Sequence, residues 1–406
     1  MPLLDKFAAV NEIRAGLNTS DHDPTRVVIE EILSATEGLV EGRHTILAGT
    51  NNYLGLTFDP ACIEAGRQAL ETQGSGTTGS RMANGSFAIH TALEREFADF
   101  YGMPHGMVFS TGYAANLGTL TGLLAPGDAV LLDADAHASL YDGCRMSGAE
   151  IFRFKHNDVE SLEKRLRRLG ERAQNCLIVT EGLYSVLGDC APLKEIVALK
   201  ERYGAMLLVD EAHSLGAYGE HGRGVAEAEG VLERVDFLVG TFSKSLGSMG
   251  GFCVSPHAEL ALLRYVSRPF IFTASSSPSI IATTREALRQ LRTRPELRQR
   301  LWQNARQLYQ GLKSLGYRTG RQASPVVAVL IGEKQAALDC WNRLLSAGIY
   351  VNLMIPPASP DSFSYLRCSV SAAHTPEQIE TIIEAFRQLK SSALQEPVVS
   401  ADAQPA

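Results

Sequence analysis

The sequence predicts an α/β protein with a large domain built on a mostly parallel β-sheet, followed by a smaller C-terminal α+β domain. In the middle of the chain, short runs rich in Val, Leu and Ile alternate with helical patterns, as expected for parallel strands that are covered on both faces. From about Pro278 the pattern changes to a long helical stretch followed by shorter mixed segments. Functional groups of such sheets gather at the carboxyl ends of the strands, so we expect the site there.

Each element follows from the spacing of its apolar residues. The strands of the large domain are predicted at residues 107–110, 129–133, 176–180, 206–210 and 237–241, with helices at 159–169 and 193–203. The smaller domain is predicted to contain a helical stretch at 280–315, strands at 326–331, 349–352 and 365–369, and helices at 334–347 and 376–390. The expected division is a helical N-terminal segment at 1–45, a large domain at 46–280, a small domain at 281–392 and a disordered tail at 393–406.

Composition narrows the class of protein. A chain of 406 residues is too long for one compact core, and its net charge of -7 argues against a nucleic-acid binder, which needs a basic surface. The seven cysteines show no C-x-x-C spacing, which favours a reducing compartment over a zinc or disulfide framework. No apolar stretch reaches the roughly 18–20 residues that span a bilayer. We expect a cytoplasmic protein with at most peripheral membrane association and no bound metal.

Two polar motifs follow predicted strands. Asp210-Glu-Ala-His213 begins where one apolar run ends, and Thr241-Phe-Ser243-Lys244 follows the next run. Because both fall at strand carboxyl ends, they can converge on one cleft. Pyridoxal phosphate requires a carboxylate that keeps its pyridine nitrogen protonated and an amine that forms an imine and moves the α-proton of the substrate. The pattern therefore predicts a pyridoxal-phosphate enzyme with a Schiff base on Lys244.

These motifs also occur in other classes of protein. Asp-Glu-Ala-His also occurs in helicases, but a helicase needs a G-x-x-x-x-G-K-[ST] loop, and Lys244 is preceded by Ser243. A single lysine on a Gly/Ser loop is roughly ten times more often structural than catalytic. The combination with Asp210 and His213 reverses those odds.

Three further segments supply candidate cofactor contacts. Gly112 and Tyr113 open a helical stretch after an apolar run, and a glycine turn at a helix N-terminus presents N–H groups and a positive dipole end to a phosphate. The same turn could be an ordinary helix start, and Tyr113 could stack, hydrogen-bond or merely pack. His137 follows another strand end and could stack on a pyridine ring, although a lone histidine is more often structural. Ser185 could bond the phenolic oxygen of the cofactor or belong to a simple turn.

Taken together and in order, these segments resemble the α-oxoamine synthases, a family of fold-type I pyridoxal-phosphate transferases whose sheet is of the seven-stranded type. The resemblance covers about residues 45–390. It rests on residues 51–55, 79–81, 110–116, 133–137, 181–189, 210–213, 241–251 and 366–369. Within the family, residues 137–144, 268–275, 350–352 and 356–358 are most similar to the bacterial branch that joins L-serine to palmitoyl-CoA.

The resemblance implies a catalytic role for four residues. Lys244 would hold the cofactor as an imine, and Asp210 would bind its pyridine nitrogen. His213, together with Ser185, would bind the phenolic oxygen. His137 would stack on the ring and help to orient the amino acid.

The resemblance also implies binding roles. Gly112, Tyr113, Thr241 and Ser243 would hold the phosphate, with Thr273 contributed by the partner subunit of a homodimer. Asn52 and Arg367 would bind the substrate carboxylate, for which a planar guanidinium is well suited.

The reaction implied is a condensation of an amino acid with an acyl thioester, with loss of CO₂ and release of the thiol. Two departures from the serine-using branch leave the donor open. Ile355 stands where that branch has an arginine before the Pro-Pro pair, and segment 85–90 keeps one of two expected histidines, His90. L-serine with a long acyl thioester is the first choice, and a sister synthase that uses glycine or alanine is the alternative. A non-catalytic partner subunit is disfavoured because it has no reason to keep Lys244 beside Asp210 and His213.

Overall fold

A computed structural model describes residues 2–17 and 22–393 of the chain. It divides into two compact units, which are described separately here. The large unit comprises residues 51–302 and 371–373, and the small unit comprises residues 1–50, 303–370 and 374–406. The predicted tail at 393–406 lies almost entirely outside the described residues.

The large unit is built on a sheet of seven strands in the order β4-β10-β9-β8-β7-β5-β6. The pairs β5–β6, β5–β7, β7–β8 and β8–β9 are parallel, whereas β10 runs antiparallel to both β9 and β4. The mostly parallel seven-stranded sheet is thereby confirmed. Its strands are β4 His105–Phe109, β5 Ala129–Asp133, β6 Glu150–Phe154, β7 Leu177–Glu181, β8 Met206–Asp210, β9 Phe237–Thr241 and β10 Gly251–Ser255.

Burial explains why the sequence revealed most of these strands. Every residue of β5, β7, β9 and β10 is buried, so these strands appear as continuous apolar runs. The core beneath them combines side chains of β5, β7, β8 and β9 with residues of the covering helices, among them Leu120 and Leu140. The five predicted strands are confirmed with shifts of at most two residues at their ends, and the predicted helices at 159–169 and 193–203 are confirmed as α6 and α7.

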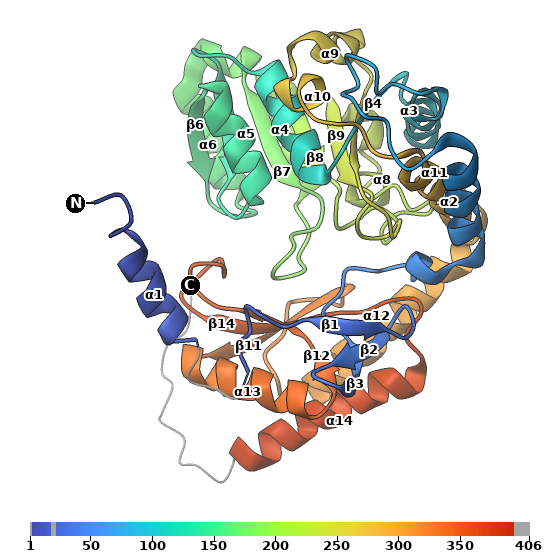
Figure 1. The fold of residues 1–406 in the computed structure, drawn as a ribbon. Helices are drawn as coiled ribbons and strands as arrows, with labels where there is room; N and C mark the ends of the chain where they lie inside the picture. Colours follow the sequence, from blue (N-terminus) through green and yellow to red (C-terminus); the bar gives the residue numbers. More distant parts are fainter. Residues whose placement is uncertain (1, 18–21, 394–406) are drawn as a thin grey trace. The chain divides into compact units, whose positions relative to one another are not determined.

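Helices pack against this sheet, and α2, α3 and α11 lie together at one end of it (Figure 1). The helices of the large unit are α2 Pro60–Gln73, α3 Ala88–Tyr101, α4 Gly112–Leu123, α5 Ala138–Ser147, α6 Val159–Leu169, α7 Leu193–Tyr203, α8 Val225–Ala228, α9 Leu263–Val266, α10 Arg268–Ile271 and α11 Pro278–Thr293. Short 3-10 helices occur at η1 Leu56–Phe58, η2 Gly170–Asn175, η3 Leu232–Arg234 and η4 Ala258–Leu262.

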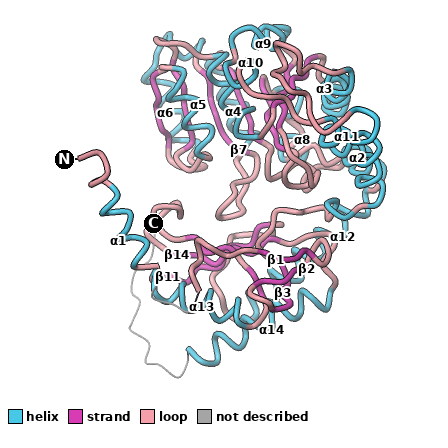
Figure 2. The backbone as a smooth tube through the Cα atoms, viewed as in Figure 1, coloured by secondary structure: helices cyan, strands magenta, loops and turns pink. Residues whose placement is uncertain are grey.

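The small unit contains two sheets and is α+β, as predicted. One sheet has the order β1-β2-β3-β12 and the other β11-β14-β13. Its strands are β1 Ile29–Ile32, β2 Glu37–Val40, β3 Arg43–Leu47, β11 Val326–Gly332, β12 Ile349–Tyr350, β13 Asn352–Met354 and β14 Ser364–Ser369. Its helices are α1 Phe7–Ala15, α13 Lys334–Ser346, α14 Pro376–Ala393 and most of α12 Pro295–Ser314 (Figure 2).

The structure corrects the prediction of a helical N-terminal segment at 1–45. Only α1 is an α-helix there, and β1, β2 and β3 follow it within the described residues. None of the three is a continuous buried run, since β1 is mostly exposed and β2 and β3 are only partly buried. They form because β3 pairs with β2 and with β12, about three hundred positions later in the chain. The units also divide within α12 rather than near residue 280, which falls inside α11. The predicted helical stretch at 280–315 is two helices, because Pro295 begins a new one.

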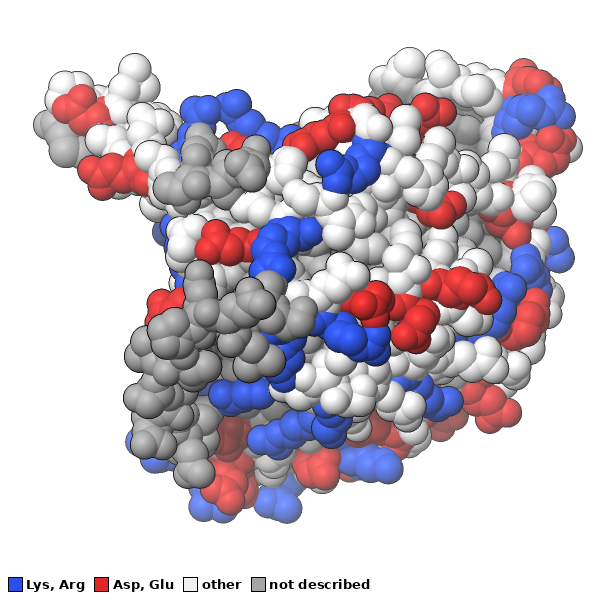
Figure 3. Space-filling view, turned by 90° about the horizontal axis from the view of Figure 1, so that it is seen from below, with Lys and Arg blue, Asp and Glu red and all other residues white. Residues whose placement is uncertain are grey.

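No helix among the described residues is both long and apolar enough to cross a membrane. On the face shown in Figure 3, basic and acidic side chains are interspersed among the described residues, and neither sign forms one broad field.

Candidate active site

The carboxyl ends of the central strands surround a cavity of about 290 Å³. In the parallel register, Glu181 at the end of β7 lies opposite Asp210 at the end of β8. The N-terminus of α4 and the segment after β9 complete the walls. The cavity is lined by Thr111, Gly112, Tyr113, Asn116, His137, Ser139, Glu181, Asp210, Ala212, His213, Gly240, Thr241, Ser243 and Lys244. Eight of the twelve residues singled out in the sequence are among them.

Asp210 provides a fixed carboxylate at the wall of this cavity. It is 4% exposed, its Oδ2 accepts a hydrogen bond from Nδ2 of Asn116 at 2.7 Å, and its Oδ1 accepts one from the backbone N–H of Ala212 at 2.8 Å. Asp210 is therefore held in one orientation, suited to a positively charged ligand nitrogen.

His137 is held as a neutral ring. Its Nδ1 lies 3.2 Å from the backbone nitrogen of Ser139 and 2.7 Å from Oγ of Ser139. A backbone N–H can only donate, so Nδ1 carries no proton and the proton of the neutral ring is on Nε2. Oγ of Ser139 in turn accepts from Nδ2 of Asn116 at 2.9 Å, which links His137 to the residue that holds Asp210. Burial lowers the pKa of His137 and so also favours the neutral form.

Lys244 lies on a tight turn after β9 and is partly buried. The turn is closed by a hydrogen bond from the backbone N–H of Ser248 to the carbonyl of Phe242 at 3.0 Å. Gly250 ends the turn at a φ of 141°, and a Cβ there would lie 2.4 Å from the ring of Phe242. Only glycine fits this position, which holds the Lys244 turn against the buried Phe242.

An anion can be held at the wall where α4 begins. Thr111 caps this helix through a hydrogen bond from the N–H of Ala114 to its Oγ1 at 3.0 Å. The first N–H groups of a helix have no partner within the helix, and the helix dipole is positive at this end. Gly112 brings the backbone close to Thr241, because a Cβ on Gly112 would lie 2.8 Å from both Cβ and Oγ1 of Thr241. Oγ of Ser243 lies 2.9 Å from Oγ1 of Thr241, so two hydroxyl groups face the helix end.

The ring of His213 is held by a residue that is distant in the sequence. Its Nδ1 lies 2.7 Å from the hydroxyl oxygen of Tyr53, which is completely buried. Tyr53 was not among the predicted site residues, although it lies in the segment 51–55 that carries the family resemblance. No local pattern links two residues that are 160 positions apart.

Glu181 is the second functional candidate that the sequence analysis missed. Its Oε1 accepts a hydrogen bond from the backbone N–H of His137 at 2.6 Å. Burial, followed by the charge of Asp210, raises the pKa of Glu181 well above its usual range. The sequence contained a signal for Glu181, because this residue ends a buried strand just as Asp210 does. Asn116 and Ser139 were likewise part of recognised segments but received no role.

Four predicted site residues do not line the cavity. Ser185 is partly buried in the loop after β7, and Thr273 is exposed between α10 and α11. Asn52 is buried and donates from Nδ2 to Oγ1 of Thr57 at 2.7 Å. Arg367 belongs to β14 of the small unit, where it is 4% exposed and donates to Oγ of Ser369 at 2.9 Å. Their roles stay predictions.

Comparison with known proteins identifies the family. The model of the aminotransferase class I and II family matches residues 43–386. The chain belongs to this family. The chain is 54% identical over 389 residues to a serine palmitoyltransferase of Caulobacter vibrioides, covering 96% of each chain. It is 51% identical over 388 residues to a serine palmitoyltransferase of Sphingomonas paucimobilis, covering 95% of this chain and 92% of the relative.

The architecture of the aminotransferase class I and II family is also found in solved structures. One of them, serine palmitoyltransferase with a PLP internal aldimine, superposes with a TM-score of 0.94 at 50% identity. It covers 97% of this chain and 99% of its own. The predicted fold-type I architecture and the resemblance to the α-oxoamine synthases, close to the bacterial serine palmitoyltransferases, are thereby confirmed.

Proposed function

We propose that this protein is a pyridoxal-phosphate-dependent acyltransferase that condenses L-serine with palmitoyl-CoA. The products would be 3-ketodihydrosphingosine, CO₂ and free CoA. The observation that carries the proposal is that Lys244, the carboxylate of Asp210 and the N-terminus of α4 surround one cavity. The names of relatives with about half of their residues identical over nearly the whole chain support the choice of reaction.

The residues present fit pyridoxal phosphate. The cofactor carries a phosphate, a pyridine nitrogen that is protonated when active, and an aldehyde that reacts with an amine. The cavity supplies a helix N-terminus with the glycine cradle at Gly112, a held carboxylate at Asp210 and the amine of Lys244. Its volume of about 290 Å³ lies at the small end of the range for small-molecule sites.

Each residue would have a defined task. When bound, pyridoxal phosphate supplies an electron sink for the negative charge that develops at the α-carbon of the amino acid. Asp210 would hold the proton on the pyridine nitrogen, and Asn116 keeps Asp210 in place for that purpose. Lys244 would hold the cofactor covalently at rest and, once serine takes its place, would remove the α-proton.

The remaining cavity residues would bind and orient. His137 would lie against the pyridine ring, and His213, with Ser185, would donate to the phenolic oxygen. Gly112, Tyr113, Thr241 and Ser243 would hold the phosphate. In the condensation, the α-carbon forms a bond with the acyl carbonyl carbon, the thiol leaves, and the serine carboxylate leaves as CO₂. The proposed contacts of that carboxylate are Asn52 and Arg367, on the family resemblance.

A sister reaction with glycine or alanine is the second candidate, and Ile355 is the observation that favours it. An arginine at this position in the serine-using branch would meet a carboxylate, and isoleucine cannot. His90 does not favour either amino-acid donor, because its ring makes hydrogen bonds that stabilise the local structure. Its Nδ1 accepts the N–H of Phe87 at 3.2 Å at the start of α3, and its Nε2 lies 2.9 Å from the carbonyl oxygen of Ser276.

We further propose a homodimer in which Thr273 reaches the phosphate of the partner subunit, and a cytoplasmic location. These rest on the family resemblance and on the exposure of Thr273.

The proposed function is tested with purified protein and pyridoxal phosphate. L-serine, L-alanine and glycine are each supplied with acyl-CoAs of different chain length, and products are identified by mass spectrometry. We expect 3-ketodihydrosphingosine from serine and palmitoyl-CoA. We expect Lys244→Ala to lose turnover and borohydride-trappable cofactor, whereas Lys164→Ala, an exposed lysine of α6, should retain both. Preference for glycine or alanine with short thioesters would reject the serine assignment, and full activity of Lys244→Ala would reject the catalytic lysine.

A further inference from the structure

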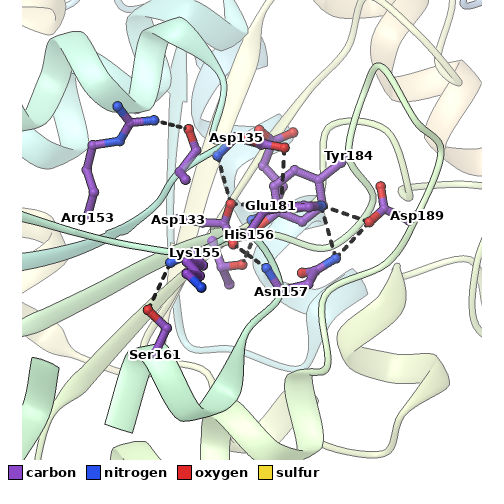
Figure 4. Close-up of polar contacts among 12 residues, drawn as sticks. Asp133, Asp135, Arg153, Lys155, His156, Asn157, Ser161, Glu181, Tyr184 and Asp189 are labelled. Carbon is purple, nitrogen blue, oxygen red and sulfur yellow. Dashed lines mark hydrogen bonds and ion pairs between the residues drawn. The ribbon is translucent and has the colours of Figure 1, made fainter. Parts of the chain in front are cut away.

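A polar cluster behind the cavity joins three neighbouring strands of the large unit. His156 follows β6, and its ring lies between two carboxylates from other segments (Figure 4). Its Nδ1 is 2.9 Å from Oδ1 of Asp133, the last residue of β5. Its Nε2 is 2.8 Å from Oδ2 of Asp189, in the loop after β7. The ring is 19% exposed, so water competes little with these contacts.

Both carboxylates are fixed by further donors. Asp133 also accepts the N–H of Asp135 at 2.9 Å and the N–H of Asn157 at 3.0 Å. Oδ2 of Asp189 accepts Nδ2 of Asn157 at 2.8 Å. Nδ2 of Asn157 also lies 3.2 Å from Nε2 of His156, but it donates to the nearer Oδ2 of Asp189. An ionised carboxylate can only accept a hydrogen bond, and both ring nitrogens face such groups. Each ring nitrogen of His156 must therefore carry a proton, which makes the ring a cation.

The pKa shifts of the cluster agree with a protonated ring. Burial lowers the pKa of His156, but the hydrogen bonds and charges of Asp133 and Asp189 outweigh it and raise the pKa to about 10. Burial would raise the pKa of Asp133, yet the bond to His156 leaves it lowered. The other titratable groups facing the ring are Asp135, at 3.9 Å, and the edge-packed ring of Tyr184, whose centroid is 4.4 Å away.

The cluster is connected through the backbone to two residues of the cavity wall, His137 and Glu181. Asp133 begins the turn that leads to His137, and the N–H of His137 is bound by Glu181 at the end of β7. Asp189 closes the loop that carries Ser185, where the N–H of Tyr184 donates to the carbonyl of Asp189 at 2.9 Å. Arg153 of β6 donates to the carbonyl of Ala134 on the same turn at 2.6 Å.

We propose that His156 is a positioning residue, a protonated imidazolium that ties the end of β5 to the loop after β7 and so holds His137 and the Ser185 loop in place for the reaction. It does not touch substrate or cofactor. A protonated ring is needed because a neutral ring would leave one of the two carboxylates, buried Asp133 or partly buried Asp189, facing a nitrogen lone pair. The proposal rests on the proposed function for its kinetic consequence but not for its structural one.

The test uses full-length protein loaded with pyridoxal phosphate and two variants, His156→Gln and Asp189→Asn. His257→Gln is the matched control, because His257 pairs with Asp236 at 3.0 Å in the same unit without lining the cavity. Hydrogen exchange is measured on peptides that cover 133–140 and 182–190. We expect faster exchange in those two peptides for His156→Gln and no change there for the control. We expect kcat to fall about 10- to 100-fold, as when a reacting group is misplaced by about 1 Å.

The decisive readout is the titration of the His156 ring, followed by NMR of ¹³C-labelled histidine and assigned by its loss in His156→Gln. In the unmodified protein the ring should stay protonated from pH 6 to about pH 9. Asp189→Asn removes one of the charges that raise the pKa, so the ring should titrate inside that range, and kcat should acquire a matching decrease toward high pH. A residue with a merely structural role would not change the shape of the pH profile.

Titration of His156 below pH 8 in the unmodified protein would overturn the proposal, as would unchanged exchange in both peptides. An unaltered pH profile of kcat in Asp189→Asn would also overturn the proposal. This variant provides the test if His156→Gln does not fold. Absence of product from serine in the unmodified protein would instead refute the proposed function, since the exchange and NMR results need no turnover.

Discussion

Substitution of Gly112 by alanine tests the anion-binding wall most directly. A Cβ at this position would lie 2.8 Å from Cβ and Oγ1 of Thr241, where ordinary contacts are 3.4–4 Å. Thr241 ends a buried strand and donates from Oγ1 to the carbonyl of Gly250 at 3.0 Å, so it cannot simply rotate away. The helix end must therefore move away from Thr241 and Ser243.

The magnitude follows from two opposing effects. Overpacking of this kind costs about 1–3 kcal/mol. In the free energy of unfolding, part of this cost is offset, because alanine is favoured over glycine in a helix by about 0.5–1 kcal/mol. Cofactor binding has no such compensation, since the helix exists with and without the ligand. If the displaced helix end loses a similar 1–3 kcal/mol of phosphate binding, the dissociation constant rises about 5- to 150-fold, at 1.4 kcal/mol for each factor of ten.

The assay is an equilibrium titration of the cofactor-free protein with pyridoxal phosphate, followed by absorbance, with urea unfolding of the same samples. Gly76→Ala is the control, because a Cβ there meets nothing within 4 Å. We expect weaker binding for Gly112→Ala and a loss of unfolding free energy below about 2 kcal/mol. Equal affinity for Gly112→Ala and the unmodified protein would show that the phosphate does not bind at this helix end.

Two further predictions concern buried polar contacts. Tyr53→Phe removes the hydroxyl that lies 2.7 Å from Nδ1 of His213, and we expect urea unfolding to show a loss of about 1–3 kcal/mol; an unchanged midpoint would mean that the bond contributes nothing. Glu94→Gln removes the charge that faces buried Arg81 at 2.9 Å, and we expect a loss of about 3–5 kcal/mol in the same assay. The more exposed Glu96→Gln should change stability by less than about 1 kcal/mol, and equal effects of the two substitutions would contradict the role of burial.

The central sheet could be predicted because its strands are buried along their whole length. β5, β8 and β9 begin and end where the sequence places them, since each is a continuous apolar run closed by a polar residue. The strands β1 to β3 could not be found in this way. β1 is largely exposed and β2 and β3 are only partly buried, and the edge of their sheet is completed by β12 at Ile349–Tyr350.

The site could be predicted where its residues end a strand or open a helix. Asp210, Thr241 and Gly112 belong to such positions, and all three line the cavity. Tyr53 could not be found from local pattern, because it reaches His213 only through the folding of the chain. The roles of Asn52 and Arg367 came from family resemblance alone, and no spacing in the sequence connects them to the cavity.

The two histidines after β5 and β6 show most clearly what a sequence does not contain. His137 and His156 each follow a parallel strand by a few residues, so the sequence pattern describes them alike. Their partners differ in kind. Nδ1 of His137 meets a backbone N–H, an obligatory donor, which requires a neutral ring. Both nitrogens of His156 meet carboxylates, which in our proposal require a cation. The protonation state therefore depends on whether the folded chain brings a donor or an acceptor to the ring, and substitution of the acceptor Asp189 is the change that should convert one kind of histidine toward the other.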